Sequence, residues 1–118
     1  MKTEDILNLD CRKEESKEII QKALKKIKPL SKYSDEVPLE AIEKLIGVLT
    51  KKYSIRIQSI NLSFVEENGS LYYSCSIKED DEHQWLGNCY GITIYELLSK
   101  VAIKLYSDIK RLEISERT

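Results

Sequence analysis

Residues 60–78, INLSFVEENGSLYYSCSIK, contain two alternating segments joined by the dipeptide Asn68-Gly69. Apolar side chains recur at every second position of both segments: Ile60, Leu62 and Phe64 in the first, and Leu71, Tyr73, Cys75 and Ile77 in the second. This period of two is typical of a strand with one buried face. Asn-Gly is a strong signal for a two-residue hairpin turn, because both residues tolerate the positive φ that a type I′ turn requires. The stretch therefore predicts an antiparallel β-hairpin.

The turn also fixes the register of the hairpin. With Asn68-Gly69 at the turn, Glu67 lies opposite Ser70. Three apolar pairs follow from that alignment: Phe64 with Tyr73, Leu62 with Cys75, and Ile60 with Ile77. A slip of one residue would place each of these side chains opposite a residue of the other face. Turn chemistry and hydrophobic pattern thus predict the same register.

A third strand is predicted from His83 to about Cys89, after the acidic segment 79–82. Pairing Lys78 with His83 gives two further positions: Leu86 opposite Cys75 on the apolar face, and Trp85 opposite Ser76 on the other face. A helix from Ile94 to about Glu113 follows the third strand.

The start of that last helix is marked by a capping box, Thr93-Ile94-Tyr95-Glu96, in which the threonine and glutamate side chains cap the first turn. Its buried stripe is predicted to contain Ile94, Leu98, Val101, Leu105, Ile109 and Leu112. Its outer face is predicted to carry Lys100, Lys104, Lys110 and Arg111.

Two helices are predicted before the strands. The first covers residues 4–28, with Thr3 as its cap, Pro29 as its stop and a break near Ser16. The second begins at Pro38 and keeps helical apolar spacing through Tyr53.

The element order helix, helix, three strands, helix predicts an α+β fold, in which a three-stranded antiparallel sheet packs on helices. With 118 residues, 42% of them hydrophobic and 33% charged, the chain suits a single domain over residues 1–118. Within that domain we expect an N-terminal helix in residues 1–30 and a core in residues 38–113. No apolar run approaches the roughly 18 residues that span a bilayer. Charged residues occupy the start of the chain, where a secretory segment would be apolar, so we predict a cytoplasmic protein with no membrane partner.

The sequence lacks the residue patterns of common catalytic and metal sites. Its three cysteines, Cys11, Cys75 and Cys89, include no Cys-x-x-Cys pair, and His83 is the single histidine, so we predict buried reduced thiols and no zinc site. Cys89 and His83 lie six residues apart on one predicted strand, roughly 20 Å, which excludes a nucleophile–base pair. The carboxylates of residues 79–82 lack the spacing of a calcium loop, and no phosphate-binding glycine motif occurs. We therefore predict a non-catalytic protein without cofactor or metal.

Residues 38–113 resemble double-stranded-RNA-binding domains in their α-β-β-β-α order. The RNA-binding members of that family open the last helix with a lysine cluster, whereas here Gly91–Glu96 occupies that place and the first lysine is Lys100. A second resemblance covers residues 85–98, WLGNCYGITIYELL, which are similar to HicB-type antitoxins and to a class of small phage and prophage proteins ending in a strand, a turn and a helix. The fixed points of this resemblance are Gly91, Thr93 and Glu96. It implies a phage or mobile-element origin.

The outer face of the sheet is the first candidate binding site. It is predicted to carry the partner-binding residues Tyr72, Ser74, Ser76, His83 and Trp85, together with Asn61, Ser63 and Val65. Large aromatic side chains among small polar ones are typical of protein interfaces. Two interpretations remain open: this face binds a protein partner or a second copy of the chain, or the N-terminal helix folds across it. The interface interpretation includes an inhibitor of a host nuclease or defence complex.

Lysines provide an alternative, a divergent nucleic-acid-binding domain. The candidate residues lie on the first and last helices: Lys22, Lys25, Lys26, Lys28, Lys100 and Lys104. The net charge of the chain is −1, and residues 55–90 carry two basic and six acidic side chains, so long-range attraction to nucleic acid should be weak.

Overall fold

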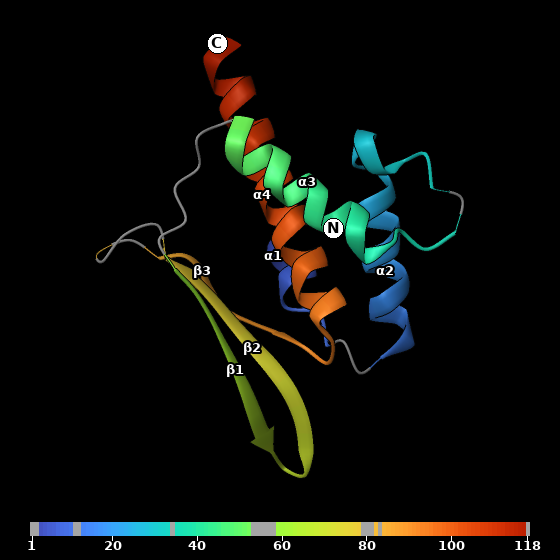
Figure 1. The fold of residues 1–118 in the computed structure, drawn as a ribbon, viewed down its shortest axis with the longest axis vertical. Helices are drawn as coiled ribbons and strands as arrows, with labels where there is room; N and C mark the ends of the chain where they lie inside the picture. The colour runs from blue at the N-terminus through green and yellow to red at the C-terminus, as the bar shows by residue number, and fades with distance from the viewer. Residues whose placement is uncertain are drawn as a thin grey trace.

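The computed structural model describes residues 3–10, 13–33, 35–52, 59–78, 82 and 84–117, with side chains described except at 59–62, 70, 75, 77, 84–88 and 111–117. The elements are α1 (Thr3–Leu7), α2 (Glu14–Lys25), the 3-10 helix η1 (Lys28–Leu30), α3 (Leu39–Lys52), β1 (Ser59–Glu67), β2 (Ser70–Lys78), β3 (Gln84–Gly91) and α4 (Ile94–Arg117) (Figure 1). The strands form one antiparallel sheet in the order β1-β2-β3. The predicted α+β class is confirmed.

The β1–β2 hairpin has the predicted turn and register. Asn68 and Gly69 adopt positive φ angles of 51° and 78°. Glu67 pairs with Ser70, and Phe64 pairs with Tyr73, as the turn chemistry requires. This register places Phe64 and Tyr73 on one face of the hairpin and Val65 and Tyr72 on the other, as the pattern predicts.

The predicted register of the third strand is wrong. Cys75 pairs with Cys89 rather than with Leu86, and Lys78 pairs with Gln84. The register shifts twice between these pairs, each time by one additional residue on β3. At each bulge, two residues of one strand lie opposite a single residue of the neighbouring strand. A register predicted by simple alternation is therefore wrong beyond a bulge. Trp85 lies at the second shift and is not the partner of Ser76, while His83 lies outside the described residues.

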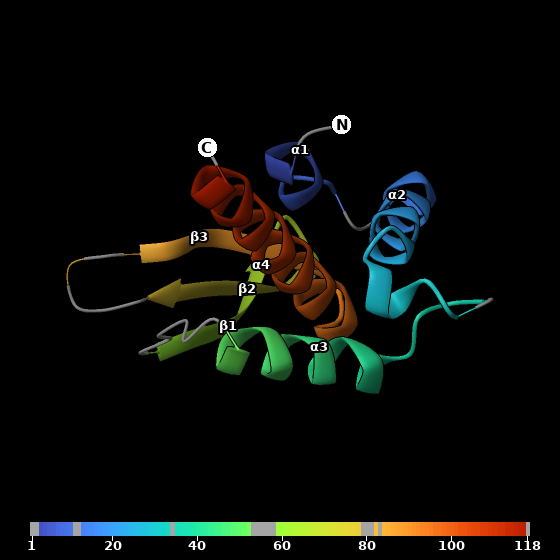
Figure 2. The same cartoon turned by 90° about the horizontal axis from the view of Figure 1, so that it is seen from above.

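The helix α4 is the centre of the molecule. It contacts β2 and β3 on one side, and α1, α2 and α3 pack around it (Figure 2). The predicted stripe residues Val101, Leu105 and Ile109 are buried, but Ile94 is exposed. Lys100, predicted to lie outside, is fully buried. A helix with neighbours on several sides has no single solvent face, and this is why the one-stripe prediction placed Lys100 wrongly.

The predicted capping of α4 is confirmed at Thr93, whereas the bond to Glu96 comes from Ile92, one residue before the predicted cap. The Glu96 N–H donates to Thr93 Oγ1 at 3.2 Å, and the Ile92 N–H donates to Glu96 Oε2 at 2.7 Å. The two bonds satisfy one backbone donor in the first turn of the helix and one just before it. They fix the conformation of the connection between β3 and α4.

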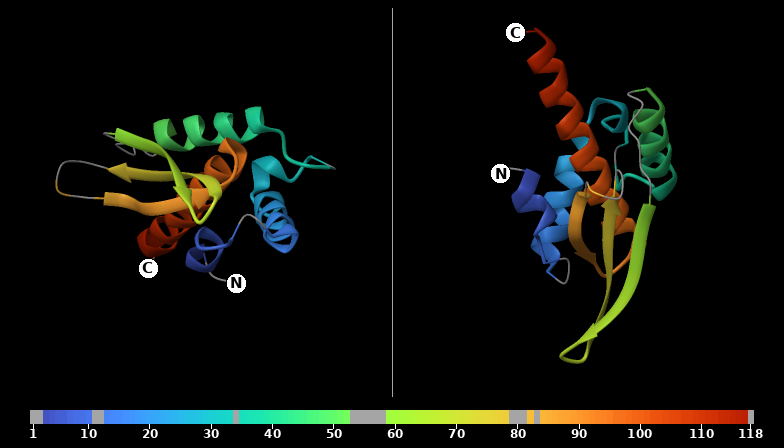
Figure 3. Two further views of the ribbon diagram at one scale, coloured as in Figure 1. Left: turned by 90° about the horizontal axis from the view of Figure 1, so that it is seen from below. Right: turned by 90° about the vertical axis from the view of Figure 1, so that its left-hand side faces the viewer.

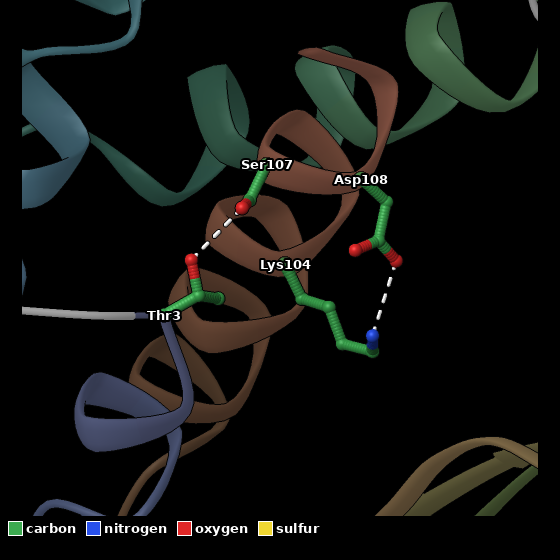
Figure 4. A network of polar contacts seen from close by, with 4 residues as sticks. All are labelled: Thr3, Lys104, Ser107 and Asp108. Atoms are coloured by element: carbon green, nitrogen blue, oxygen red, sulfur yellow. Dashed lines mark hydrogen bonds and ion pairs between the residues drawn. The ribbon is translucent and has the colours of Figure 1, made fainter. Parts of the chain in front are cut away.

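The N-terminal region forms two helices, so the predicted break is present but at another position. α1 ends at Leu7 and α2 begins at Glu14, so the break comes earlier than Ser16. The intervening segment has too few apolar residues to continue a buried stripe. Thr3 is also not an external cap, because it lies within α1 and its hydroxyl donates to Ser107 Oγ of α4 at 2.9 Å (Figure 4).

The second predicted helix corresponds to α3. It begins at Leu39, and the Pro38 carbonyl accepts from the backbone N–H groups of Ala41 and Ile42. Tyr53, its predicted last apolar position, lies outside the described residues.

Candidate functional site

The turn end of the β1–β2 hairpin projects beyond the helices (Figure 3). Gly91, the last residue of β3, pairs with Tyr73, and α4 begins three residues later. From that point α4 runs away from the hairpin turn (Figure 1). The residues between Tyr73 and the turn therefore extend past the start of α4.

Apolar side chains are exposed on this projecting end. Phe64 is 61% exposed and Leu71 is 55% exposed, and both lie on the face of the hairpin that was predicted to be covered. The Phe64 ring lies 5.1 Å from the ring of half-buried Tyr73. We call Phe64, Leu71 and Tyr73 the hairpin patch. The expectation of a fully covered apolar face is wrong here, because the helix layer stops before the strands do.

The opposite face of the hairpin carries the predicted partner-binding residues. Tyr72, Ser74 and Ser76 lie on this outer face and are half-buried. Tyr90, directly opposite Ser74, places its ring 5.4 Å from that of Tyr72 in an edge-on arrangement. Sequence reasoning missed Tyr90 because the predicted strand ended before it. His83 and the side chain of Trp85 lie outside the described residues, so their part in this face stays a prediction.

The N-terminal helices do not take the position proposed for them across the outer face. Both α1 and α2 pack against α4. The Cys89 Sγ lies 3.9 Å from the Leu7 carbonyl oxygen, which places the end of α1 on the helical side of β3. Of the two interpretations of the outer face, intramolecular cover by the N-terminal helix is thus not what the described residues show.

A groove opens where the segment after α1 meets the hairpin turn. Its volume is about 470 Å³. The groove is lined by the segment Asn8–Asp10, the turn residues Glu67 and Asn68, the tyrosines Tyr72 and Tyr90, and the segment Gly91–Ile92. The Tyr72 hydroxyl donates a short hydrogen bond to Glu67 Oε2. The outer face thus ends in a concave site with both aromatic and acidic walls.

Lys100 joins two walls of this groove from beneath. Its Nζ donates to the Leu9 carbonyl oxygen at 3.1 Å and to the Tyr90 carbonyl oxygen at 2.6 Å. A buried ammonium requires such acceptors, since it has lost its water. Lys100 belonged to the alternative set of phosphate-contacting lysines, but in this position it is unable to reach a ligand on the surface.

The other lysines of that set lie in two separate regions, the end of α2 with η1, and α4. Lys22 of α2, Lys26 just after it and Lys28 of η1 are exposed, and Lys25 is half-buried. Lys104 forms an ion pair with Asp108 of the same helix at 3.0 Å (Figure 4). The remaining accessible positive charge of the set is therefore concentrated at the end of α2.

A polar network ties α2 and α4 to the segment before α3. The Tyr95 hydroxyl donates to the Val37 carbonyl oxygen at 2.7 Å and accepts a short bond from Gln21 Nε2. Gln21 Oε1 accepts from the Val37 N–H at 3.3 Å. Burial of the hydroxyl raises the pKa of Tyr95 above 10.0, although the hydrogen bond from Gln21 acts to lower it. These contacts fix packing on the side of α4 away from the hairpin.

Two further features concern metals and membranes. Among the described residues, no group of three or more His, Cys, Asp or Glu side chains is arranged to hold a metal ion. Cys89 is a buried thiol in its reduced form, as predicted, while Cys11 and the side chain of Cys75 lie outside the description. No helix in the described part of the chain is both long enough and apolar enough to cross a membrane.

Comparison with known proteins gives no relative: no family model matches the chain, and neither a curated protein nor a solved structure matches it.

Proposed function

We propose that this chain is a small, non-catalytic interaction protein that binds a protein partner through the projecting end of its β1–β2 hairpin. The observation that carries the proposal is the exposure of Phe64 and Leu71 on one face of that end. Adjacent large apolar side chains that stay in contact with water are typical of surfaces that are covered in a complex. Covering them removes apolar area from water, which favours association by about 25 cal/mol for each Å² buried.

The position of these side chains supports the proposal. They lie on paired strands rather than in a loop, so less backbone entropy would be lost on binding. The outer face adds Tyr72 and Tyr90, and tyrosine supplies large contact area with few rotatable bonds. A partner with an apolar pocket would thus meet aromatic and aliphatic side chains on both sides of one projection.

A phage or mobile-element origin, and inhibition of a host nuclease or defence complex, are narrower proposals. They depend on the resemblance of residues 85–98 to small phage proteins and HicB-type antitoxins. The acidic balance of residues 55–90 is consistent with a partner whose surface is basic, as nucleic-acid-binding surfaces are.

Co-purification followed by direct measurement tests the proposal. The tagged chain is expressed in its native host, the proteins recovered with it are identified, and the purified candidate is titrated against the chain by calorimetry. We expect the double variant Phe64→Ser, Leu71→Ser to lose at least tenfold in affinity. Val48→Ser is the matched control, because Val48 is 51% exposed on α3, outside the hairpin. Equal loss in both variants, or in neither, would refute a role for the hairpin patch.

Two other outcomes distinguish the alternatives. Light scattering that shows a dimer dissociated by the double variant would identify the partner as a second copy of the chain, and Trp85→Ala tests the same for the outer face. Binding to generic duplex that falls steeply with salt and is weakened by Lys22→Gln and Lys26→Gln would favour the nucleic-acid alternative.

A further inference from the structure

We propose that the groove between the segment after α1 and the hairpin turn binds a cationic side chain, an arginine of the protein partner. This inference rests on the proposed function, since it names the chemistry that the partner presents. Three observations support it: the charge of the groove, its two tyrosines, and the hydrogen bonds that link its walls.

The charge of the lining is the first argument. Asp10 and Glu67 line the groove, and among the residues that the structure describes no lysine, arginine or histidine lines it. The lining also includes Asn8 and Asn68, whose side-chain oxygens are additional acceptors. Such walls attract a cation and repel a phosphate or a carboxylate. The groove therefore differs in sign from the lysine-rich end of α2.

The tyrosines add a second, independent preference. Tyr72 and Tyr90 stand edge to face, and Tyr90 is 47% exposed, so an aromatic surface borders the groove. A guanidinium stacks favourably on the face of an aromatic ring. Its planar fork also matches a carboxylate, which can accept two parallel hydrogen bonds. Arginine fits this combination of ring and carboxylate better than lysine, because an ammonium has no plane to stack.

Glu67 is positioned for this task by its neighbour. The Tyr72 hydroxyl bonds Oε2 of Glu67, which holds the carboxylate against the tyrosine. A carboxylate has about four acceptor positions on its two oxygens, so one hydrogen bond leaves capacity for a guanidinium. The same interaction links the aromatic wall to the acidic wall.

The buried ammonium of Lys100 holds the other walls in place. It bridges the carbonyl groups of Leu9 and Tyr90, both of which line the groove. Its positive charge offsets part of the negative charge of the lining, but its two hydrogen bonds are directed to backbone oxygens. A groove whose walls are linked before binding loses less entropy when a ligand enters. With about 470 Å³, the groove has room for a side chain and part of its backbone.

A titration followed by ¹H–¹⁵N correlation spectra tests the inference with defined probes. The ligand is N-acetyl-arginine N-methylamide at millimolar concentration, and the neutral control ligand is the corresponding citrulline derivative, which has nearly the same shape without the charge. We expect saturable shifts of the amide signals of Asn8, Asn68 and Tyr90 with the arginine ligand. The apparent affinity for the citrulline ligand should be at most a fifth of that for the arginine ligand.

Two variants that change the net charge equally complete the test. Glu67→Gln should weaken arginine binding at least fivefold, whereas Glu66→Gln should leave it unchanged, because Glu66 lies on the opposite face of β1. Unperturbed spectra away from residue 67 would show that the variant is folded. Equal loss in both variants would mean non-specific attraction and would overturn the inference, as would the absence of shifts at the groove.

The outcome also separates this inference from the proposed function. If the hairpin patch variant loses its partner but arginine produces no shifts in the wild type, the interaction protein stands and the arginine site falls. If the groove signals shift with protein concentration alone, and light scattering shows larger species, then a second copy of the chain occupies the groove and the arginine inference is wrong.

Discussion

The helix α4 and the β1–β2 hairpin are both amphipathic in sequence, but they differ in how much of their apolar surface the fold covers. Leu105 of α4 is fully buried, and so is the charged side chain of Lys100, five residues earlier in the same helix. In the hairpin, Phe64 and Leu71 remain more than half exposed although they lie on the apolar face. The two regions therefore reverse the usual placement of charged and apolar residues.

The difference shows that burial depends on neighbours as well as on pattern. α4 has helices around it in addition to the sheet, so even the polar position at Lys100 is enclosed. The projecting part of the hairpin has strand partners but lies beyond the start of α4 (Figure 3). We therefore expect α4 to contribute most to the stability of the fold, and the projecting end of the hairpin to contribute most to binding.

The largest expected effect contrasts two leucines. Leu105→Ala should lower the free energy of unfolding by about 3 to 4 kcal/mol, because it removes buried methyl groups and leaves a cavity. Leu71→Ala should change the same free energy by no more than about 0.5 kcal/mol, as surface substitutions usually do. Denaturant unfolding of both variants measures the difference. If both variants lost a similar free energy of unfolding, Leu71 would belong to the core, and the contrast between α4 and the hairpin would be wrong.

Two lysines of α4 give the next effect. Lys100→Met keeps the apolar stem but removes the donor that Leu9 and Tyr90 share, and we expect a loss of about 2 kcal/mol. Lys104→Met removes a half-buried ion pair with Asp108 one turn along the same helix, and pairs at this spacing usually contribute no more than about 0.5 kcal/mol. Hydrogen exchange at the amides of residues 4–9 should rise in the Lys100 variant alone. Unchanged exchange there would show that Lys100 does not hold α1 in place.

The sequence predicts those features that depend on neighbouring residues. The Asn68-Gly69 turn and the Thr93–Glu96 capping box are each defined by side chains within a few positions of the backbone groups they serve. The turn was predicted with its backbone conformation and the helix start with its Thr93 cap, although Glu96 accepts from the Ile92 N–H. The hairpin register followed from the turn, because the alternation of residues then leaves a single alignment.

Features that depend on contacts distant in the chain were not predictable in the same way. Lys100 is buried because Leu9, ninety-one positions earlier, brings its carbonyl to the ammonium. The groove similarly combines the segment after α1 with a turn near residue 68. Tyr72 was predicted as a binding residue from its face, but its contact with Tyr90 needed the true register of β3. Local patterns carry no information about which distant segment covers which surface.

Two glycines show the same contrast between helix and hairpin in the backbone. Neither Gly69 nor Gly47 has an atom within 4 Å of an added Cβ, so space does not distinguish them. Gly69 has a φ of 78°, and an alanine there should cost about 1 to 1.5 kcal/mol. Gly47 lies inside α3, where alanine should stabilise by about 0.5 to 1 kcal/mol. Thermal unfolding should therefore shift in opposite directions. A shift in the same direction would show that the turn conformation contributes nothing to the stability of the hairpin end.

The smallest effect concerns Tyr95, on the side of α4 away from the hairpin. Tyr95→Phe removes the donor to the Val37 carbonyl oxygen, and near neutral pH we expect a loss of about 1 kcal/mol. Since burial raises the pKa of the folded tyrosine above 10.0, the unfolded chain ionises first as the pH increases. The unfolded state then binds fewer protons than the native state, so the contribution of Tyr95 to stability is complete below pH 10 and declines as the pH rises through the folded pKa.

The gap between wild type and Tyr95→Phe should accordingly narrow when unfolding is measured from pH 8 to pH 11. Taking the difference between the two proteins cancels the titration of the other tyrosines and of the lysines, which both share. Tyr72→Phe provides the hairpin counterpart, because its hydroxyl bonds the exposed carboxylate of Glu67. A hydrogen bond at the surface contributes less than one to a buried carbonyl, so this variant should lose less stability than Tyr95→Phe. If Tyr72→Phe were instead the more destabilised of the two, the hairpin end would be held by polar contacts of a strength that its exposure does not predict.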